Sequence, residues 1–157
     1  MADEKGTPKT GFMMCLYYSD TLGGTGTDIL ISAVEDVSLS NVAREMIELA
    51  HRGTKWKKKL AGMMEAPTVE FKLFHNIEPA VERALWSHLT SAEPFLLKVM
   101  NGPIDEAGSE GFSMPVLLSE MPWSQGLSEV SARDVKCELA YAVHNGSEVE
   151  PEWITTA

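Results

Sequence analysis

The chain has 157 residues, of which 44% are hydrophobic and 23% are charged, and its formal net charge is −10. These values are typical of a globular domain and too apolar for a wholly disordered chain. The acidic charge disfavours tight binding of nucleic acid over the surface, because phosphate is repelled. The apolar stretch Phe12–Tyr18 is too short to span a membrane, so we expect neither a membrane span nor secretion.

The first part of the chain predicts a flexible arm followed by short strands. Residues 1–11 are small and polar, which is typical of a disordered N-terminal arm. A buried strand is expected over residues 13–18 and a flexible glycine-containing loop over residues 20–27. Apolar residues then alternate over 29–33, and the alternation of residues 37–40 predicts a half-exposed strand.

The segment Arg44–Leu49 has two interpretations. As a strand it places Glu45, Ile47 and Leu49 on one face, but neither face is wholly apolar, so a helical turn is the alternative. Residues 51–66 then predict a long basic hairpin loop that returns the chain to the sheet.

One α-helix is expected in the middle of the chain, after a strand over residues 69–74. Asn76 can cap it, and Pro79 in its first turn costs no internal hydrogen bond. Glu93–Pro94 ends it. Its apolar stripe repeats every four residues and consists of Ile77, Val81, Leu85 and Leu89.

Strands are expected again in the last third of the chain. Residues 95–100 form a short apolar run, and residues 112–118 alternate. Pro115 cannot donate to a ladder, which places it on an edge strand or at a bulge. A final strand pair is expected over residues 127–143, and the polar, acidic residues 145–157 predict a C-terminal arm.

This order of elements predicts a mainly β fold. Antiparallel hairpins with a single helix indicate a β-sandwich or barrel with one flanking α-helix. We expect residues 1–157 to form one domain.

Catalytic and metal-binding patterns are weak in this sequence. The glycines of residues 23–27 are not followed by the Lys-Ser/Thr of a phosphate-binding loop, and no Gly-x-Ser-x-Gly motif occurs. Cys15 and Cys137 have no zinc or redox spacing and are expected to be buried and reduced. Four histidines lie on different expected elements without a paired spacing: His51, His75, His88 and His144. We therefore expect no enzyme activity, cofactor or metal.

A basic cluster within the 51–66 loop is the strongest candidate functional feature. It has three interpretations: a solvated loop, a nucleic-acid patch in which an aromatic ring stacks on bases, or a docking surface for other copies of an acidic protein. The cluster consists of Arg52, Lys55, Trp56, Lys57, Lys58 and Lys59.

The order of these features over residues 34–143 resembles the major tail tube protein of long-tailed, siphovirus-type bacteriophages, a family shared with gene transfer agents. Within Gly53–Gly62, the positions of Trp56, Leu60 and Gly62 are similar to the family's Gly-Trp-x-x-x-Leu-x-Gly element. The strands on either side and the single helix follow in the order that the family has.

This resemblance implies a structural virion protein that is assembled in the host cytoplasm. Family members form hexameric rings that stack into a hollow tube, through which DNA passes without specific binding. Sheets join around each ring, and the hairpin loop and terminal arms bridge adjacent rings. The basic cluster would then be an inter-ring contact. Other implied partners are the tape measure, terminator and distal tail proteins.

Three alternatives remain at this point. A tube or completion-ring protein of a contractile tail or secretion system would share the fold. A small-ligand-binding β-barrel would require a closed apolar pocket. An enzyme with a dispersed site would require two or more titratable residues in one cleft.

Overall fold

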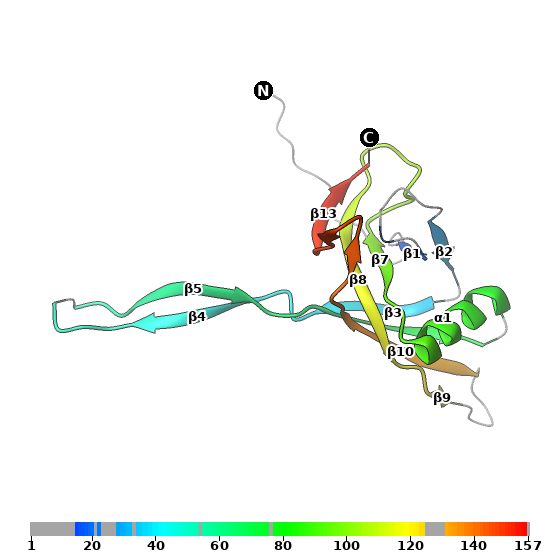
Figure 1. The fold of residues 1–157 in the computed structure, drawn as a ribbon, viewed down its shortest axis with the longest axis horizontal. Helices are drawn as coiled ribbons and strands as arrows, with labels where there is room; N and C mark the ends of the chain where they lie inside the picture. Colours follow the sequence, from blue (N-terminus) through cyan, green and yellow to red (C-terminus); the bar gives the residue numbers. More distant parts are fainter. Residues whose placement is uncertain are drawn as a thin grey trace.

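The structure is a computed structural model, and most of the chain is described in it (Figure 1). The described residues are 15–20, 22, 28–32, 34–53, 55–75, 77–124 and 131–156. The predicted N-terminal arm over residues 1–11, the glycines of the 20–27 loop and the predicted cap Asn76 lie outside them.

Strands dominate the described residues, and every strand pair is antiparallel. The main sheet has the order β2-β1-β7-β8-β10-β6-β3, with β13 added to β8 and β9 added to β10. Its strands are β1 (Cys15–Ser19), β2 (Ile29–Ile31), β3 (Val34–Ser40), β6 (Thr68–Phe74), β7 (Phe95–Met100), β8 (Glu110–Glu120), β9 (Trp123–Ser124), β10 (Ala132–Leu139) and β13 (Glu152–Thr155). Two small sheets pair β4 (Arg44–Leu49) with β5 (Lys58–Met64), and β11 (Val143–His144) with β12 (Ser147–Glu148).

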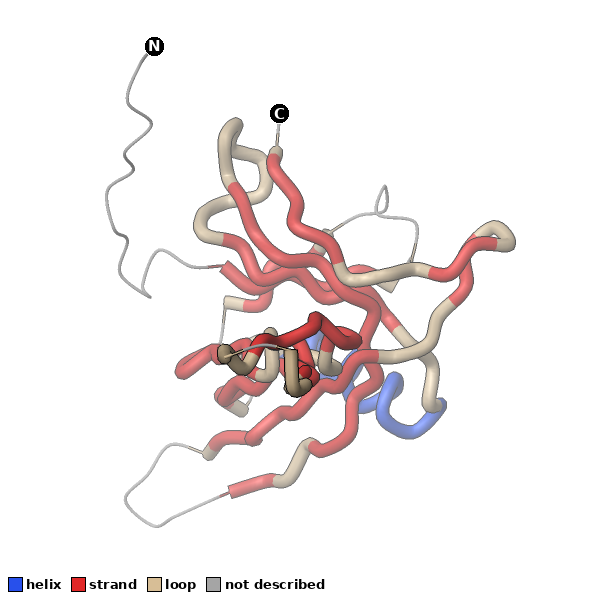
Figure 2. Tube along the Cα trace, turned by 90° about the vertical axis from the view of Figure 1, so that its left-hand side faces the viewer, coloured by secondary structure: helices blue, strands red, loops and turns tan. Residues whose placement is uncertain are grey.

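The main sheet curves around one hydrophobic core. Leu16 and Ile31, near one end of the strand order, belong to the same buried cluster as Val69 and Phe71, near the other end. A flat sheet would separate such strands by about 4.8 Å for each intervening step. Figure 2 shows the strands wrapping around a common interior rather than lying in one plane. The predicted mainly β fold with one helix is confirmed.

The helix α1 (Pro79–Ser91) covers part of this core. Val81 and Leu85 are buried, and Leu89 packs against the core, as the stripe predicts. Ile77 does not belong to the stripe, because it precedes the helix and is 60% exposed. The helix ends at Ala92, whose left-handed conformation (φ 57°) stops it just before Glu93–Pro94.

Pro115 lies on the central strand β8, where the register with β7 is continuous, so neither of its predicted places, an edge strand or a bulge, is correct. On one side, Pro115 is opposite Leu96 of β7. On the other side, its carbonyl accepts a hydrogen bond from the Ala140 N–H (3.0 Å), just beyond the last β8–β10 pair, Val116 with Leu139. The missing N–H therefore falls where the ladder with β10 has ended.

The predicted C-terminal arm over residues 145–157 is largely integrated into the body. Strand β13 pairs with the first residues of β8, from Glu152 opposite Ser113 to Thr155 opposite Glu110. Beyond it, the Thr156 N–H donates to the Ser109 carbonyl (2.8 Å). The strand was not predicted because the segment is acidic and its stability comes from pairing with residues about forty positions away.

Removing a buried side chain from the curved sheet should destabilise the fold strongly. Leu97 on β7 is fully buried, and we expect Leu97→Ala to lower the free energy of unfolding by about 2–5 kcal/mol. Leu30→Ala is the matched control, because Leu30 is 44% exposed, and it should change that free energy by about 0.5 kcal/mol or less. Equal effects in urea unfolding would contradict this core.

Burial also controls the chemistry of Cys137, which is buried as predicted, whereas Cys15 is only half-buried. Burial raises the pKa of the Cys137 thiol from 9.0 to about 12. Below pH 9 the thiol is protonated in both states, so the shift has no effect on stability. Between pH 9 and pH 12 the unfolded chain releases this proton more readily than the folded one, so stability falls.

We expect the Cys137→Ala variant to lose less stability than the wild type as the pH rises from 9 to 12. Urea unfolding measured at several values in that interval checks this. Parallel pH profiles for the two proteins would show that Cys137 makes no contribution.

Candidate assembly surface

Strands β4 and β5 form a two-stranded ribbon that projects from the body as an arm (Figure 1). We define the arm as residues 44–64. The strand interpretation of Arg44–Leu49 is therefore the correct one. The predicted 51–66 loop is partly wrong, because residues 58–64 are strand β5 and the connection between the strands spans only residues 50–57.

The root of the arm is held by backbone hydrogen bonds and a bulge. Asn41 has a positive φ of 61°, and the Glu65 N–H donates to the Ala43 carbonyl (2.8 Å). The register shifts between Arg44 and Met46. At this irregularity Arg44 Nη1 donates to the Gly62 carbonyl (2.8 Å), and a Cβ at Gly62 would lie only 3.1 Å from the Glu45 Cβ. Bulges of this kind bend and twist a strand pair.

One face of the arm is apolar and exposed. Ile47 lies opposite Leu60, and Leu49 lies opposite Lys58 on the same face. Ile47, Leu49 and Leu60 are 49%, 44% and 53% exposed, although side chains of this kind are normally buried. An isolated two-stranded hairpin is at best marginally stable in water. The arm therefore presents an apolar face that the described residues leave uncovered.

The outer part of the arm is basic. The structure brings the predicted contact residues together there, and all of them are exposed. Trp56 is 75% exposed. Lys57 Nζ lies 3.6 Å from Glu48 Oε1, and because both side chains are exposed this ion pair contributes at most about 1 kcal/mol. The predicted set is Arg52, Lys55, Trp56, Lys57, Lys58 and Lys59.

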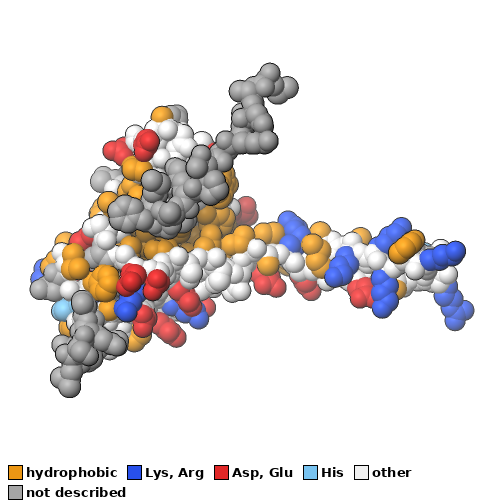
Figure 3. Space-filling view, turned by 180° about the vertical axis from the view of Figure 1, so that it is seen from behind, with side chains coloured by type: hydrophobic (Ala, Val, Ile, Leu, Met, Phe, Trp, Pro, Cys, Tyr) orange, Lys and Arg blue, Asp and Glu red, His pale blue; other side chains and the backbone are white. Residues whose placement is uncertain are grey.

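Charge divides the molecule into two parts of opposite sign. The arm contains six Lys or Arg residues and two Glu residues, a net charge of +4, so the remaining residues carry −14 of the total of −10. Figure 3 shows the blue side chains spread along the arm and the red ones gathered on the body. The arm of one copy is therefore complementary to the body of another.

Sequence reasoning missed the apolar residues at the arm root. Met63 and Met64 are 81% and 55% exposed, and Val42, just before β4, is 54% exposed. The available signal was the presence of apolar residues on both sides of a basic turn, which indicates a hairpin with exposed apolar side chains rather than a loop.

Among other kinds of site, titratable residues do share one hollow, where His75, Glu82 and Arg133 meet, but the Glu82 carboxylate is already engaged by the other two. Two hollows of about 290 and 280 Å³ are lined partly by charged side chains, so neither is the closed apolar pocket that a small-ligand-binding barrel would require. Among the side chains that the structure describes, no group of three or more His, Cys, Asp or Glu residues is arranged to hold a metal ion. No helix in this part of the chain is long and apolar enough to span a membrane.

Comparison with solved structures places the fold among tail proteins. The chain superposes on a subunit from the tail of an empty gene transfer agent particle, refined with C6 symmetry, with a TM-score of 0.68 and 14% identity over 96% of this chain and 100% of the other. It superposes on the SPP1 tail tube with a TM-score of 0.66 and 11% identity, over 94% of this chain and 80% of the other. It superposes on a chain of the six-fold symmetrised baseplate of the anti-feeding prophage with a TM-score of 0.64 and 9% identity, over 96% of this chain and 98% of the other.

No family model and no curated protein matches the sequence. The likeness is therefore one of fold, and at this level the resemblance to tail tube proteins is confirmed.

Proteolysis tests the exposure of the arm. In the free subunit, among the cations that the structure describes, we expect trypsin to cleave first after those of residues 52–59, since exposed loop tips are the preferred sites of nicking. Lys98, which is buried in β7, should be protected until the domain unfolds. Mass spectrometry of the early fragments identifies the sites, and early cleavage at Lys98 would contradict the structure.

Proposed function

We propose that this chain is a structural protein without enzyme activity, which assembles with its own copies into stacked hexameric rings that form the hollow tube of a phage-like tail. The single observation that carries the proposal is the arm, which exposes an apolar face and a basic tip on an acidic body. The likeness in fold to the gene transfer agent tail and to the SPP1 tail tube supports it.

The arm is suited to bridge rings. It extends away from the body (Figure 1), which leaves its apolar face accessible to a second copy. Burying Ile47, Leu49 and Leu60 in that contact would add to assembly at about 25 cal/mol per Å² of apolar surface. The basic tip, with Trp56 at its centre, would dock on the acidic body of the next ring.

Ring formation would use the open edges of the main sheet. Strands β2 and β3 end the strand order, and β13 has one partner, β8. Such edges are prone to pair with other chains, and joining them around a ring removes the exposed backbone groups.

The polar face of β3, β6 and β10 suits a channel for DNA. Lys72 lies between Glu35 and Asp134, and Lys136 is opposite Glu70. With Glu138, four exposed carboxylates outnumber two lysines there, so this face would repel phosphate and let DNA slide. The tape measure, terminator and distal tail proteins are the further partners of such a tube, which would reside in the virion.

One alternative has an observation in its favour. The likeness to the anti-feeding prophage baseplate supports a tube or completion-ring protein of a contractile tail or secretion apparatus. Electron microscopy of the concentrated protein separates these roles, because a tube subunit should form long tubes and a completion protein single rings. A protein that remains monomeric at high concentration would refute both.

A charge reversal at the arm tip tests the inter-ring contact. We expect Trp56→Ala combined with Lys57→Glu and Lys58→Glu to leave the fold intact, because all three side chains are exposed, but to abolish ring stacking. Circular dichroism checks folding, and negative-stain microscopy counts tubes. Tubes of normal length from this variant would show that the arm tip makes no such contact.

A further inference from the structure

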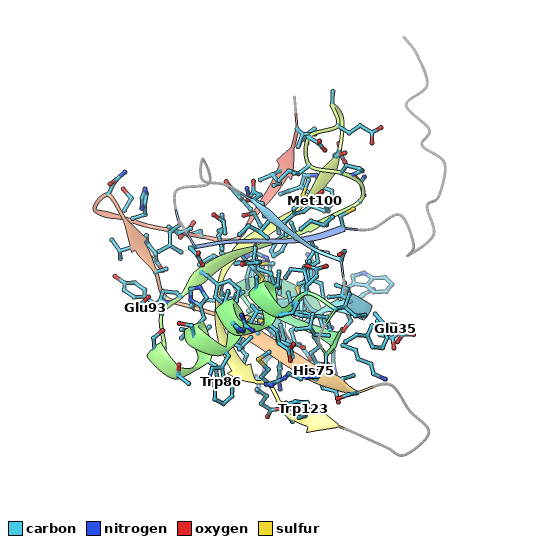
Figure 4. The ribbon with its side chains drawn as sticks, turned by 90° about the vertical axis from the view of Figure 1, so that its right-hand side faces the viewer. Glu35, His75, Trp86, Glu93, Met100 and Trp123 are labelled. Carbon is cyan, nitrogen blue, oxygen red and sulfur yellow. The ribbon has the colours of Figure 1, made fainter. Side chains whose placement is uncertain are left out.

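A stacked group of aromatic and cationic side chains lies on the body, outside the arm. The Arg133 guanidinium is 4.6 Å from the centre of the Trp123 ring and 5.9 Å from that of Trp86. The His75 ring lies 4.1 Å from Trp123. Figure 4 shows His75, Trp86 and Trp123 together below α1. We call these four residues, with Arg83 of α1, the aromatic–arginine surface.

A buried carboxylate holds this surface in place. Glu82 Oε1 accepts a hydrogen bond from His75 Nδ1 (2.7 Å) and lies 2.8 Å from Arg133 Nε. Its side chain is 10% exposed and that of Arg133 is 15% exposed. The charge of Glu82 is thus engaged within the surface, while Trp86 and Trp123 remain 52% and 50% exposed. Half-exposed tryptophans beside arginine are typical of interface centres.

The chemistry of the hollow beside these rings defines what it can bind. Arg83 and Arg133 contribute two positive charges against the single, already engaged carboxylate of Glu82. Arg83 is exposed, so its fork of donors is open to a carboxylate. The Trp86 ring offers an apolar wall. The hollow therefore suits a partner with carboxylates next to a flat or apolar group.

The same chain carries such a segment. Residues 148–153 contain three glutamates, and Glu148, Glu150 and Glu152 are all exposed. Pro151 separates the last two, and Trp153 is 66% exposed. We propose that the Glu148–Trp153 segment of a second copy docks on the aromatic–arginine surface.

The two surfaces cannot meet within one molecule. Strand β13 lies on the opposite side of the body from α1 and β9 in Figure 1, and the side view of Figure 4 agrees. A contact between different patches on two copies is heterologous and propagates into a ring or a filament. The inference rests on the proposed self-assembly and names a contact that does not involve the arm.

Cross-linking tests the proposed proximity directly. Arg83→Cys and Glu150→Cys are prepared as separate single variants, mixed and oxidised. We expect covalent heterodimers from the mixture and few dimers from either variant alone, because only the mixture places one new thiol on each surface. Cys137 is buried, and the wild type treated in the same way gives the background from the native thiols. Heterodimers at the level of this background would overturn the inference.

Exchanging the charges tests the chemistry. Arg83→Glu and Glu150→Arg should each raise the protein concentration needed for assembly about tenfold, or about 1.4 kcal/mol. The double variant should restore assembly, because the pair is re-formed with reversed signs. Arg83→Glu with Glu93→Arg is the matched control: it has the same net charge, but exposed Glu93 lies beyond the end of α1 and outside both surfaces. Equal rescue by this control would show an effect of net charge alone and would overturn the inference.

The outcomes separate this inference from the proposed function. If tubes form but the specific cross-link does not, the proposed function stands and this contact is rejected. If cross-linked heterodimers form but tubes do not, the contact stands and the proposed function is rejected. If the Arg83→Cys variant forms a cross-link only with an added foreign acidic protein, the aromatic–arginine surface binds another partner, and the inference is rejected.

Discussion

A ribbon of two strands cannot bury its own side chains, and the proposed assembly depends on this constraint. Every β4 and β5 residue except Gly62 is exposed, including Ile47, Leu49 and Leu60 on the apolar face. The sheet of the body has a core to stabilise it, whereas the described contacts of the arm are cross-strand pairs, a bulge at its root and exposed polar contacts such as that of Lys57 with Glu48. In the proposed assembly, a second copy covers this apolar face and supplies charge of the opposite sign.

The body supplies what the arm lacks, a closed core from which a projection can extend in a fixed direction. Curvature brings both ends of the strand order into one buried cluster, and α1 seals part of it through Val81 and Leu85. The connections into the arm leave this core directly, since β3 precedes β4 and β6 follows β5. Strand β3 is a partly exposed edge strand, but β6 is buried at alternate positions and opens only at high free energy, so one side of the arm root is anchored in the core.

Local patterns predicted the elements that local physics determines. The helix Pro79–Ser91 and strand β7 follow from apolar periodicity and flanking prolines. Strand β7 has the predicted bounds, and the helix ends before Glu93–Pro94 as predicted but begins after Ile77 of the predicted stripe. Strand β5 was missed because Lys58–Met64 shows no alternation and becomes a strand only through its register with β4. Strand β13 was interpreted as an arm for the same reason. Pro115 was assigned to an edge strand or a bulge because the sequence does not show where the ladder with β10 ends. The basic tip was identified from composition, whereas the aromatic–arginine surface required distant residues to be brought together by the fold.

The two proposed contacts differ in the assembly that each can specify. A single heterologous contact yields either a closed ring or an open filament, depending on the rotation between copies. The arm extends far from the body, whereas the aromatic–arginine surface and the Glu148–Trp153 segment both lie on the body itself (Figure 1). The proposed contact between bodies fixes the rotation between immediate neighbours. The arm reaches beyond the body, so it joins copies that the contact between bodies does not connect. Two such independent contacts extend an assembly in two directions, which a tube of stacked rings requires and a simple filament does not.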